Sequence, residues 1–150
     1  MPVPQSVVKI NKDGVTYTSS VDKAQYTIQE LTRAALRDVG KFVCKDFKKN
    51  YYASHKKQSG RVGKFTQYWV KYKQKNPELQ VGLKPNAFYG GFQELGTHSQ
   101  PKEGLLANAV QQNIAKIREI ESQYLEYLED EAKALAAISE EDYEGGAEGE

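Results

Sequence analysis

Residues 21–49 read VDKAQYTIQELTRAALRDVGKFVCKDFKK, and this stretch decides the fold. Its apolar residues recur at steps of three and four, the spacing that places side chains on one face of a helix. That stripe consists of Val21, Ala24, Ile28, Leu31, Ala35, Val39, Phe42, Val43 and Phe47. The pattern predicts a helix of about 29 residues, roughly 43 Å long at ~1.5 Å per residue. Cys44, the only cysteine, lies within the pattern and is expected to be buried and inert.

The segment before this helix carries a hairpin signal. Two runs rich in β-forming residues, 7–10 and 15–18, flank an Asp13-Gly14 pair. Such a pair tolerates the positive φ angles of a tight turn, so we expect a β-hairpin over 7–18. A two-stranded hairpin is marginally stable alone, so it must pack on something else.

The region after the helix predicts a loop and then a sheet. Residues 50–64 show no apolar periodicity and are basic, which is typical of a mobile loop. Short β-rich runs at 65–73, 79–83 and 87–95 are separated by turn residues. They predict a three-stranded antiparallel meander within residues 65–95.

The C-terminal third predicts a second long helix. Apolar residues spaced at 3.5 to 3.7 indicate a helix over 104–138, about 35 residues and roughly 50 Å long. A helix of that length exceeds what a small sheet can cover, so another copy of the protein is expected to bury part of its stripe. The acidic, Gly-rich segment 139–150 is expected to be disordered in isolation.

Together these elements predict one α+β domain over residues 1–138, followed by the acidic tail. A small antiparallel β-sheet, built from the meander plus the N-terminal hairpin, is expected to pack with two long α-helices. A chain of 150 residues is long enough to bury a real core.

The charge is divided unevenly along the chain. Residues 1–75 hold 16 Lys and Arg against 5 Asp and Glu, residues 76–150 hold 5 against 15, and the whole chain is +1. Two explanations stay open at this stage. The folded molecule has one basic and one acidic region, whose opposite charges could attract stacked or ring-forming copies, or the two halves interleave and their charges mix.

The sequence contains no plausible catalytic grouping. The only histidines, His55 and His98, lie in separate polar segments, and a single cysteine leaves no metal-ligand spacing. The neighbours His98 and Ser99 seldom face each other as a nucleophile and its base would need to. The carboxylates of 119–150 fit a solvated helix face better than acid–base chemistry. We therefore expect no enzyme activity, no metal and no cofactor.

No targeting or membrane segment is expected. The N-terminus lacks a basic start followed by a long apolar run, so no signal peptide is predicted. No stretch approaches 18 apolar residues, so no membrane contact is expected.

A small DNA-binding protein is the alternative from a different functional class. The basic face of helix 21–49 and the loop supply many cations, and aromatic residues stand near them in sequence, as nucleic-acid binding requires. Those aromatic residues are Tyr51, Tyr52, Phe65, Tyr68 and Trp69. Against this alternative, no nucleic-acid-binding motif is recognisable and the acidic half would repel a polyanion.

Several short motifs occur in an order that resembles a known family. Ser59-Gly60-Arg61-Val62 is followed by Val81-Gly82, by the stretch Tyr89-Gly-Gly-Phe-Gln-Glu94-Leu95-Gly96-Thr97, and by Gly104-Leu-Leu-Ala-Asn-Ala-Val110. Over about residues 21–125 this order is similar to the tail-completion and head–tail joining (neck) proteins of long-tailed, siphophage-type bacteriophages. Gly104, Ala107, Asn108 and Leu95 depart from the residues usual there.

The resemblance implies a structural virion protein of the phage neck or upper tail, assembled in the host cytoplasm. It implies a homo-oligomeric ring, six-fold to match the tail tube, acting as a tail-completion or tail-terminator protein. The implied partners are the tail tube protein and connector, stopper or terminator proteins, with incidental contact to phage DNA.

The candidate site residues fall into three groups. Loop residues expected to meet a neighbouring ring, DNA or the tail lumen are His55, Lys56, Lys57, Arg61 and Lys64. Motif residues are Tyr89, Glu94, Leu95, Gly96 and Thr97, where Gly96 makes a left-handed turn and Glu94 accepts backbone N–H bonds. Residues of the expected interface helix are Tyr124, Leu128 and Leu135.

Overall fold

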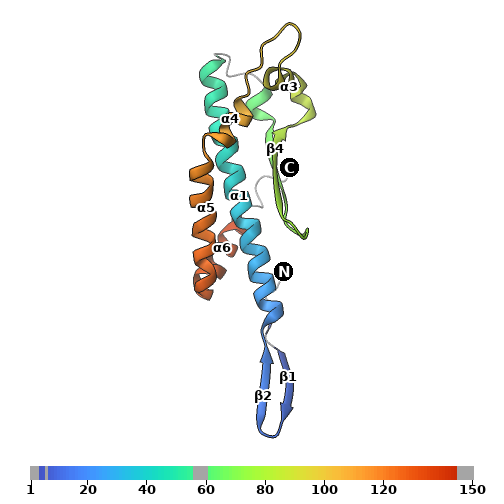
Figure 1. Ribbon diagram of the computed structural model, residues 1–150, viewed down its shortest axis with the longest axis vertical. Coiled ribbons are helices and arrows are strands. Elements are labelled where there is room, and N and C mark those ends of the chain that lie inside the picture. Colours follow the sequence, from blue (N-terminus) through green and yellow to red (C-terminus); the bar gives the residue numbers. More distant parts are fainter. Residues whose placement is uncertain (1–3, 6, 56–60, 145–150) are drawn as a thin grey trace.

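The computed structural model describes residues 4–5, 7–55 and 61–144. A single long helix, α1 (Val21–Ser54), runs through most of its length, and the other elements are arranged along it (Figure 1). The β3–β4 hairpin lies to one side of α1 and helix α5 lies to the other. The predicted mixed α and β composition is therefore confirmed, although its finer details differ.

The N-terminal hairpin forms as the Asp-Gly pair predicts. Strand β1 (Val7–Lys12) pairs antiparallel with β2 (Val15–Ser19), and the register is irregular between Val8 and Ile10. Asp13 and Gly14 both have positive φ, 53° and 79°, as a tight hairpin turn requires. Figure 1 shows this hairpin projecting beyond the end of α1, away from the other described elements.

Helix α1 is five residues longer at its C-terminal end than expected, so the predicted loop 50–64 is wrong at both ends. Tyr51 is buried and extends the apolar stripe by one more turn. A short helix, α2 (Arg61–Lys64), begins beyond the gap in the description, and its Val62 is fully buried. Residues 56–60 lie outside the described part of the chain.

The expected three-stranded meander is also wrong. Strand β3 (Thr66–Lys71) pairs antiparallel with β4 (Glu78–Leu83) in the register Thr66↔Leu83. The segment expected to be the third strand is instead a 3-10 turn, η1 (Pro85–Ala87), and a helix, α3 (Phe88–Leu95). Helical spacing puts Ala87 and Gly90 on one face, where both are buried, so tertiary packing overrides the β propensity of the aromatic residues.

The final helix is broken rather than continuous over 104–138. It consists of α4 (Leu105–Gln111), α5 (Ile114–Glu126), the 3-10 turn η2 (Tyr127–Glu129) and α6 (Glu131–Glu144). Asn113 donates to the Ala109 carbonyl and to the Asp46 carboxylate. Asp130 accepts hydrogen bonds from the amides of Ala132 and Lys133, so it caps α6.

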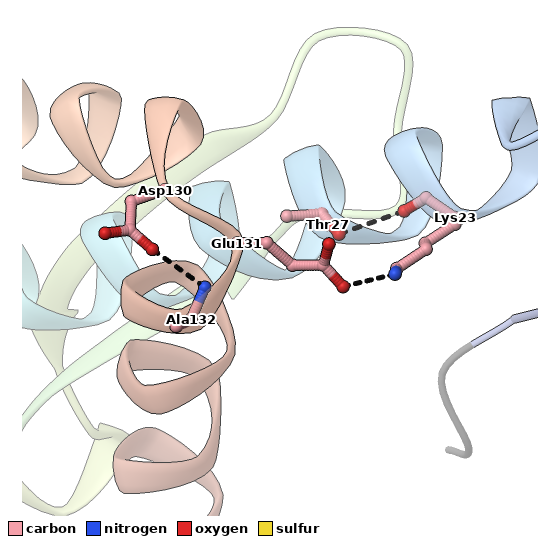
Figure 2. Close-up of polar contacts among 5 residues, drawn as sticks. All are labelled: Lys23, Thr27, Asp130, Glu131 and Ala132. Atoms are coloured by element: carbon pink, nitrogen blue, oxygen red, sulfur yellow. Dashed lines mark hydrogen bonds and ion pairs between the residues drawn. The ribbon is translucent and has the colours of Figure 1, made fainter.

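The second break lets the chain fold back onto α1. Figure 2 shows Asp130 bonded to Ala132 at the start of α6, beside the ion pair between Lys23 and Glu131. Ala134 and Ile138 of α6 then pack with Leu31 in a small apolar cluster. Part of the predicted C-terminal stripe is thus buried within the chain, and residues 139–144, expected to be tail, continue the helix.

The main core lies around the C-terminal half of α1. Its buried members are Val39, Val43, Phe47, Tyr51, Val62, Ala87 and Ala109. The first turns of the same apolar stripe are not covered, because Val21 is 55% exposed and Ile28 is 52% exposed. Helix α1 therefore leaves this chain's core before it reaches the hairpin.

Candidate functional site

A cationic groove runs between α1 and strand β3. Five basic residues of α1 at steps of four, four, four and three line one wall, and strand and turn residues line the other. The charged lining residues are Arg33, Arg37, Lys41, Lys45, Lys48, Lys64 and Lys84. The groove has a volume of about 1340 Å³, and its described lining contains no Asp or Glu.

Aromatic side chains share this groove. Tyr68 and Tyr72 are part of its lining, and Trp69 belongs to it while remaining 65% exposed. The Arg33 guanidinium lies 5.6 Å from the centre of the Tyr72 ring and pairs with Glu30 at 2.9 Å. Cations and exposed aromatic surface are thus available to one ligand.

The close approach of β3 to α1 depends on Gly40. A Cβ atom at this position would lie 2.7 Å from Cγ of Tyr68, a distance that real Cβ contacts essentially never show. The glycine therefore lets the Tyr68 ring lie directly on the helix backbone, which sets the separation of the two groove walls.

The fold brings together only part of the aromatic and basic set predicted from the sequence. Tyr68, Trp69 and Lys64 reach the groove, whereas Tyr51 is buried and Tyr52 and Phe65 pack against the core. Lys84 was missed, because only the β3–β4 pairing brings the end of β4 alongside Thr66. No short sequence pattern specifies the Thr66↔Leu83 register, so the sequence carries no local signal for Lys84.

His55 lies at the C-terminal end of α1 and contacts residues of its own chain. Its ring stacks on Tyr51 with centroids 4.2 Å apart, and its Nε2 lies 3.2 Å from Oε1 of Glu103. It therefore attaches the end of α1 to the segment before α4. This histidine–carboxylate pair lines neither of the two pockets described here. Arg61 begins α2, whereas Lys56 and Lys57 lie outside the described residues.

The motif residues form a structural junction between α3 and α4. Gly96 ends α3 with φ +78°, and a Cβ there would lie 2.9 Å from the Lys102 backbone nitrogen. Thr97 and Gln100 exchange backbone hydrogen bonds of 2.8 and 3.3 Å across the next turn. Leu95 is 75% exposed, whereas Tyr89 packs against the core.

Glu94 supplies the main polar contact of this junction. Its Oε2 accepts the Leu106 N–H and its Oε1 accepts the Ala107 N–H, each at 2.9 Å. The expected backbone bonds to Glu94 are thus present, but they hold the start of α4 instead of the turn at Thr97.

An apolar pocket of about 440 Å³ opens beside this junction. Its lining comes from α1, β4, α3, α4 and α5, with Glu94 and Glu121 as the charged members. The apolar members are Leu36, Val39, Val43, Leu79, Val81, Leu106, Ala107, Val110 and Ile117. Val110 is 40% exposed, so the pocket is accessible to an apolar side chain from outside.

The expected interface residues divide between two environments. Leu128 is 44% exposed, and its neighbour Leu125 is 65% exposed. Tyr124 packs instead against the Leu31 cluster, and its hydroxyl donates a short hydrogen bond to Asp38. Leu135 is half-buried. Of the three expected residues, Leu128 keeps the exposed apolar character expected of an interface, and Val110 and Ile114 are also exposed earlier in the predicted helix.

Among the described residues, no group of three or more His, Cys, Asp or Glu is placed to hold a metal ion. In the same part of the chain, no helix is both long and apolar enough to cross a bilayer.

No family model, curated protein or solved structure matches this chain.

Proposed function

We propose that this protein is a structural component of a phage neck or upper tail, which forms a ring as a tail-completion or tail-terminator protein. The order of motifs from Ser59 to Val110 motivates the family. The observation that carries an assembly role is the N-terminal arm, defined here as the β1–β2 hairpin and the first turns of α1.

The hairpin of the arm has no extended packing partner among the described elements, whereas Lys23 in the first turns of α1 pairs with Glu131 of α6. Neither strand makes more than sparse contact with any element other than its own partner strand. Val15 is 69% exposed, and the apolar stripe of α1 continues into the arm with Val21 and Ile28 exposed. Because an isolated two-stranded hairpin is marginally stable, packing of the arm against a neighbouring molecule would stabilise it.

A ring is the natural result if that neighbour is another copy. The arm of one copy would contact a different surface on the next, which makes a head-to-tail interface. Such interfaces close into rings when the rotation between copies is suitable. The accessible pocket beside Val110 and the exposed Leu125 and Leu128 offer apolar surface for contacts with a neighbouring copy or with other neck and tail proteins.

The test uses two matched pairs of substitutions in the full chain. Val21→Asp with Ile28→Asp adds two charges to the exposed stripe of the arm. Gln74→Asp with Asn76→Asp adds the same two charges to exposed positions in the β3–β4 turn. Mass photometry of each protein, alone and with tail tube and connector proteins, reports the assembled fraction, and thermal melting at dilution reports the fold.

We expect the arm pair to dissociate the ring while the melting temperature at dilution stays within a few degrees of wild type. The turn pair should assemble normally. A wild-type protein that stays monomeric at high concentration, with and without tail tube or connector protein, would overturn the proposal.

A further inference from the structure

We infer that the groove between α1 and β3 binds single-stranded nucleic acid, with phosphates against its basic residues and a base stacked on Trp69. This inference does not rest on the neck role, since it concerns a different surface from the arm. The sequence indicates basic and aromatic residues suited to nucleic-acid binding, and the fold determines which of these residues line one groove.

The basic residues of α1 recur every three or four positions, so they can contact successive phosphates of a strand that lies along the helix. Arg33, Arg37, Lys41, Lys45 and Lys48 follow one face of α1 over about 22 Å, at ~1.5 Å per residue. A strand that places a phosphate every ~3.4 Å or more passes at most about six phosphates along that distance. Lys64 and Lys84 add charge from the β3–β4 side.

Two carboxylates of α1, Asp38 and Asp46, bond to residues on the side of the helix that faces α5. The Asp38 carboxylate accepts a hydrogen bond from the Tyr124 hydroxyl, and the Asp46 carboxylate accepts one from the side-chain amide of Asn113. Glu30 pairs with the groove residue Arg33 at 2.9 Å. The described lining of the groove itself holds seven basic residues and no Asp or Glu.

The aromatic residues favour nucleic acid over an acidic protein segment. An acidic peptide would use the lysines and arginines but would gain little from an indole. Nucleobases stack on aromatic side chains with about 1–3 kcal/mol per base. Trp69, at 65% exposure, leaves that surface in solvent beside the basic wall.

The same residue favours a single strand over a duplex. In a duplex, both faces of an internal base are already stacked on its neighbours, so the indole could reach only the backbone or an end. An unpaired strand can present a base to Trp69 while its phosphates follow α1.

The experiment measures fluorescence anisotropy of a labelled oligothymidylate of about 12 nucleotides with the full-length protein. Three variants are compared with wild type: Lys45→Gln with Lys48→Gln in the groove, Trp69→Ala, and Lys49→Gln with Lys75→Gln as the control. The control removes the same charge from exposed lysines outside the groove. Thermal melting verifies that each variant is folded.

With about four phosphates neutralised, wild-type affinity should fall about 50-fold between 50 and 200 mM salt. The groove pair should lose about tenfold or more at low salt and show a shallower salt slope. Trp69→Ala should also lose about tenfold, with Trp69→Phe in between. The control pair should stay within about twofold, and a duplex of equal length should bind more weakly.

Four results would each overturn the inference: no binding at 50 mM salt, equal weakening by the control pair, equal or tighter binding of the duplex, or no dependence on Trp69. If polyglutamate competed as well as the oligonucleotide and Trp69→Ala had no effect, an acidic protein segment would be the better ligand. Loss of the groove activity alone would leave ring assembly intact, so failure of this inference is distinguishable from failure of the proposed function.

Discussion

Glu94 caps a helix that begins eleven residues later in the chain, because its Oε2 accepts the Leu106 N–H at 2.9 Å. The other carboxylate oxygen, Oε1, accepts the Ala107 N–H at the same distance. The residue preceding α4 is Gly104, with φ +63° and no side chain to cap the helix. A residue at the end of α3 therefore supplies what the local sequence lacks, and α3 and α4 are joined through one side chain.

Replacing Glu94 with alanine should destabilise the fold by about 2 kcal/mol, since it removes charge-assisted hydrogen bonds from two helix N–H groups. Glu94→Gln keeps one oxygen acceptor and should cost about half as much. Urea denaturation measures both changes. Glu119→Ala is the control, because it removes an exposed glutamate paired with Lys116 and should cost less than about 0.5 kcal/mol. Equal effects of Glu94→Ala and the control would contradict the capping role.

Two glycine-to-alanine substitutions should act in opposite directions. Gly40→Ala places a Cβ 2.7 Å from the Tyr68 ring, so the sheet must move off α1, at a cost of about 1–3 kcal/mol. Gly91→Ala, within α3, meets no atom within 4 Å and should stabilise by about 0.5–1 kcal/mol through helix propensity. Thermal melting of the two variants decides the matter. Stabilisation by Gly40→Ala would show that Tyr68 does not pack on the helix backbone.

The hydroxyl of Tyr124 should contribute to stability through its bond to Asp38. Tyr124→Phe should cost about 1–2 kcal/mol, since it leaves a partly buried carboxylate without this donor. Tyr127→Phe removes a hydroxyl from the same apolar cluster but not this bond, and should cost clearly less. Indistinguishable urea midpoints for the two variants would argue against the Tyr124–Asp38 contact.

Tyr51 should make stability depend on alkaline pH. Burial raises the pKa of its phenol above the ordinary value of 10.0, the hydrogen bond to Gln93 opposes the shift, and nearby Tyr89 and Glu103 add to it. Because the folded pKa is higher, this stabilisation is complete below about pH 10 and is lost as pH rises toward the folded pKa. The stability difference between wild type and Tyr51→Phe should therefore shrink from pH 9 to 11 in urea melts. A difference that stays constant over this range would show that Tyr51 ionises equally in both states.

The local sequence patterns predict those elements whose determinants are themselves local. The Asp13-Gly14 pair predicts the N-terminal hairpin, and the apolar stripe predicts α1 to within five residues. Both depend on the backbone preference of a turn or the spacing along one helix. The same stripe does not reveal that Val21 and Ile28 stay uncovered, because exposure depends on what the remaining chain can reach.

The errors occur where tertiary contacts override local preference. The aromatic run 87–95 favours a strand, yet Gly90 fits closely against Leu83 and Val62 as part of a helix. The periodicity of 104–138 continues through Asn113 and Asp130, whose side-chain hydrogen bonds accompany the helix breaks. The groove was anticipated as a basic helix face with nearby aromatics. The second wall of the groove could not be predicted, because it depends on the β3–β4 register, which no short sequence pattern specifies.

We propose that this chain completes its packing in a multi-copy ring, and the mass of the protein in solution tests the proposal. Sedimentation velocity of the full-length protein over a wide concentration range should show a discrete assembly, six copies if the resemblance holds for stoichiometry. Its fraction should rise with concentration. A single species at the monomer mass of 16.9 kDa at every concentration, unchanged by added tail tube protein, would contradict the account.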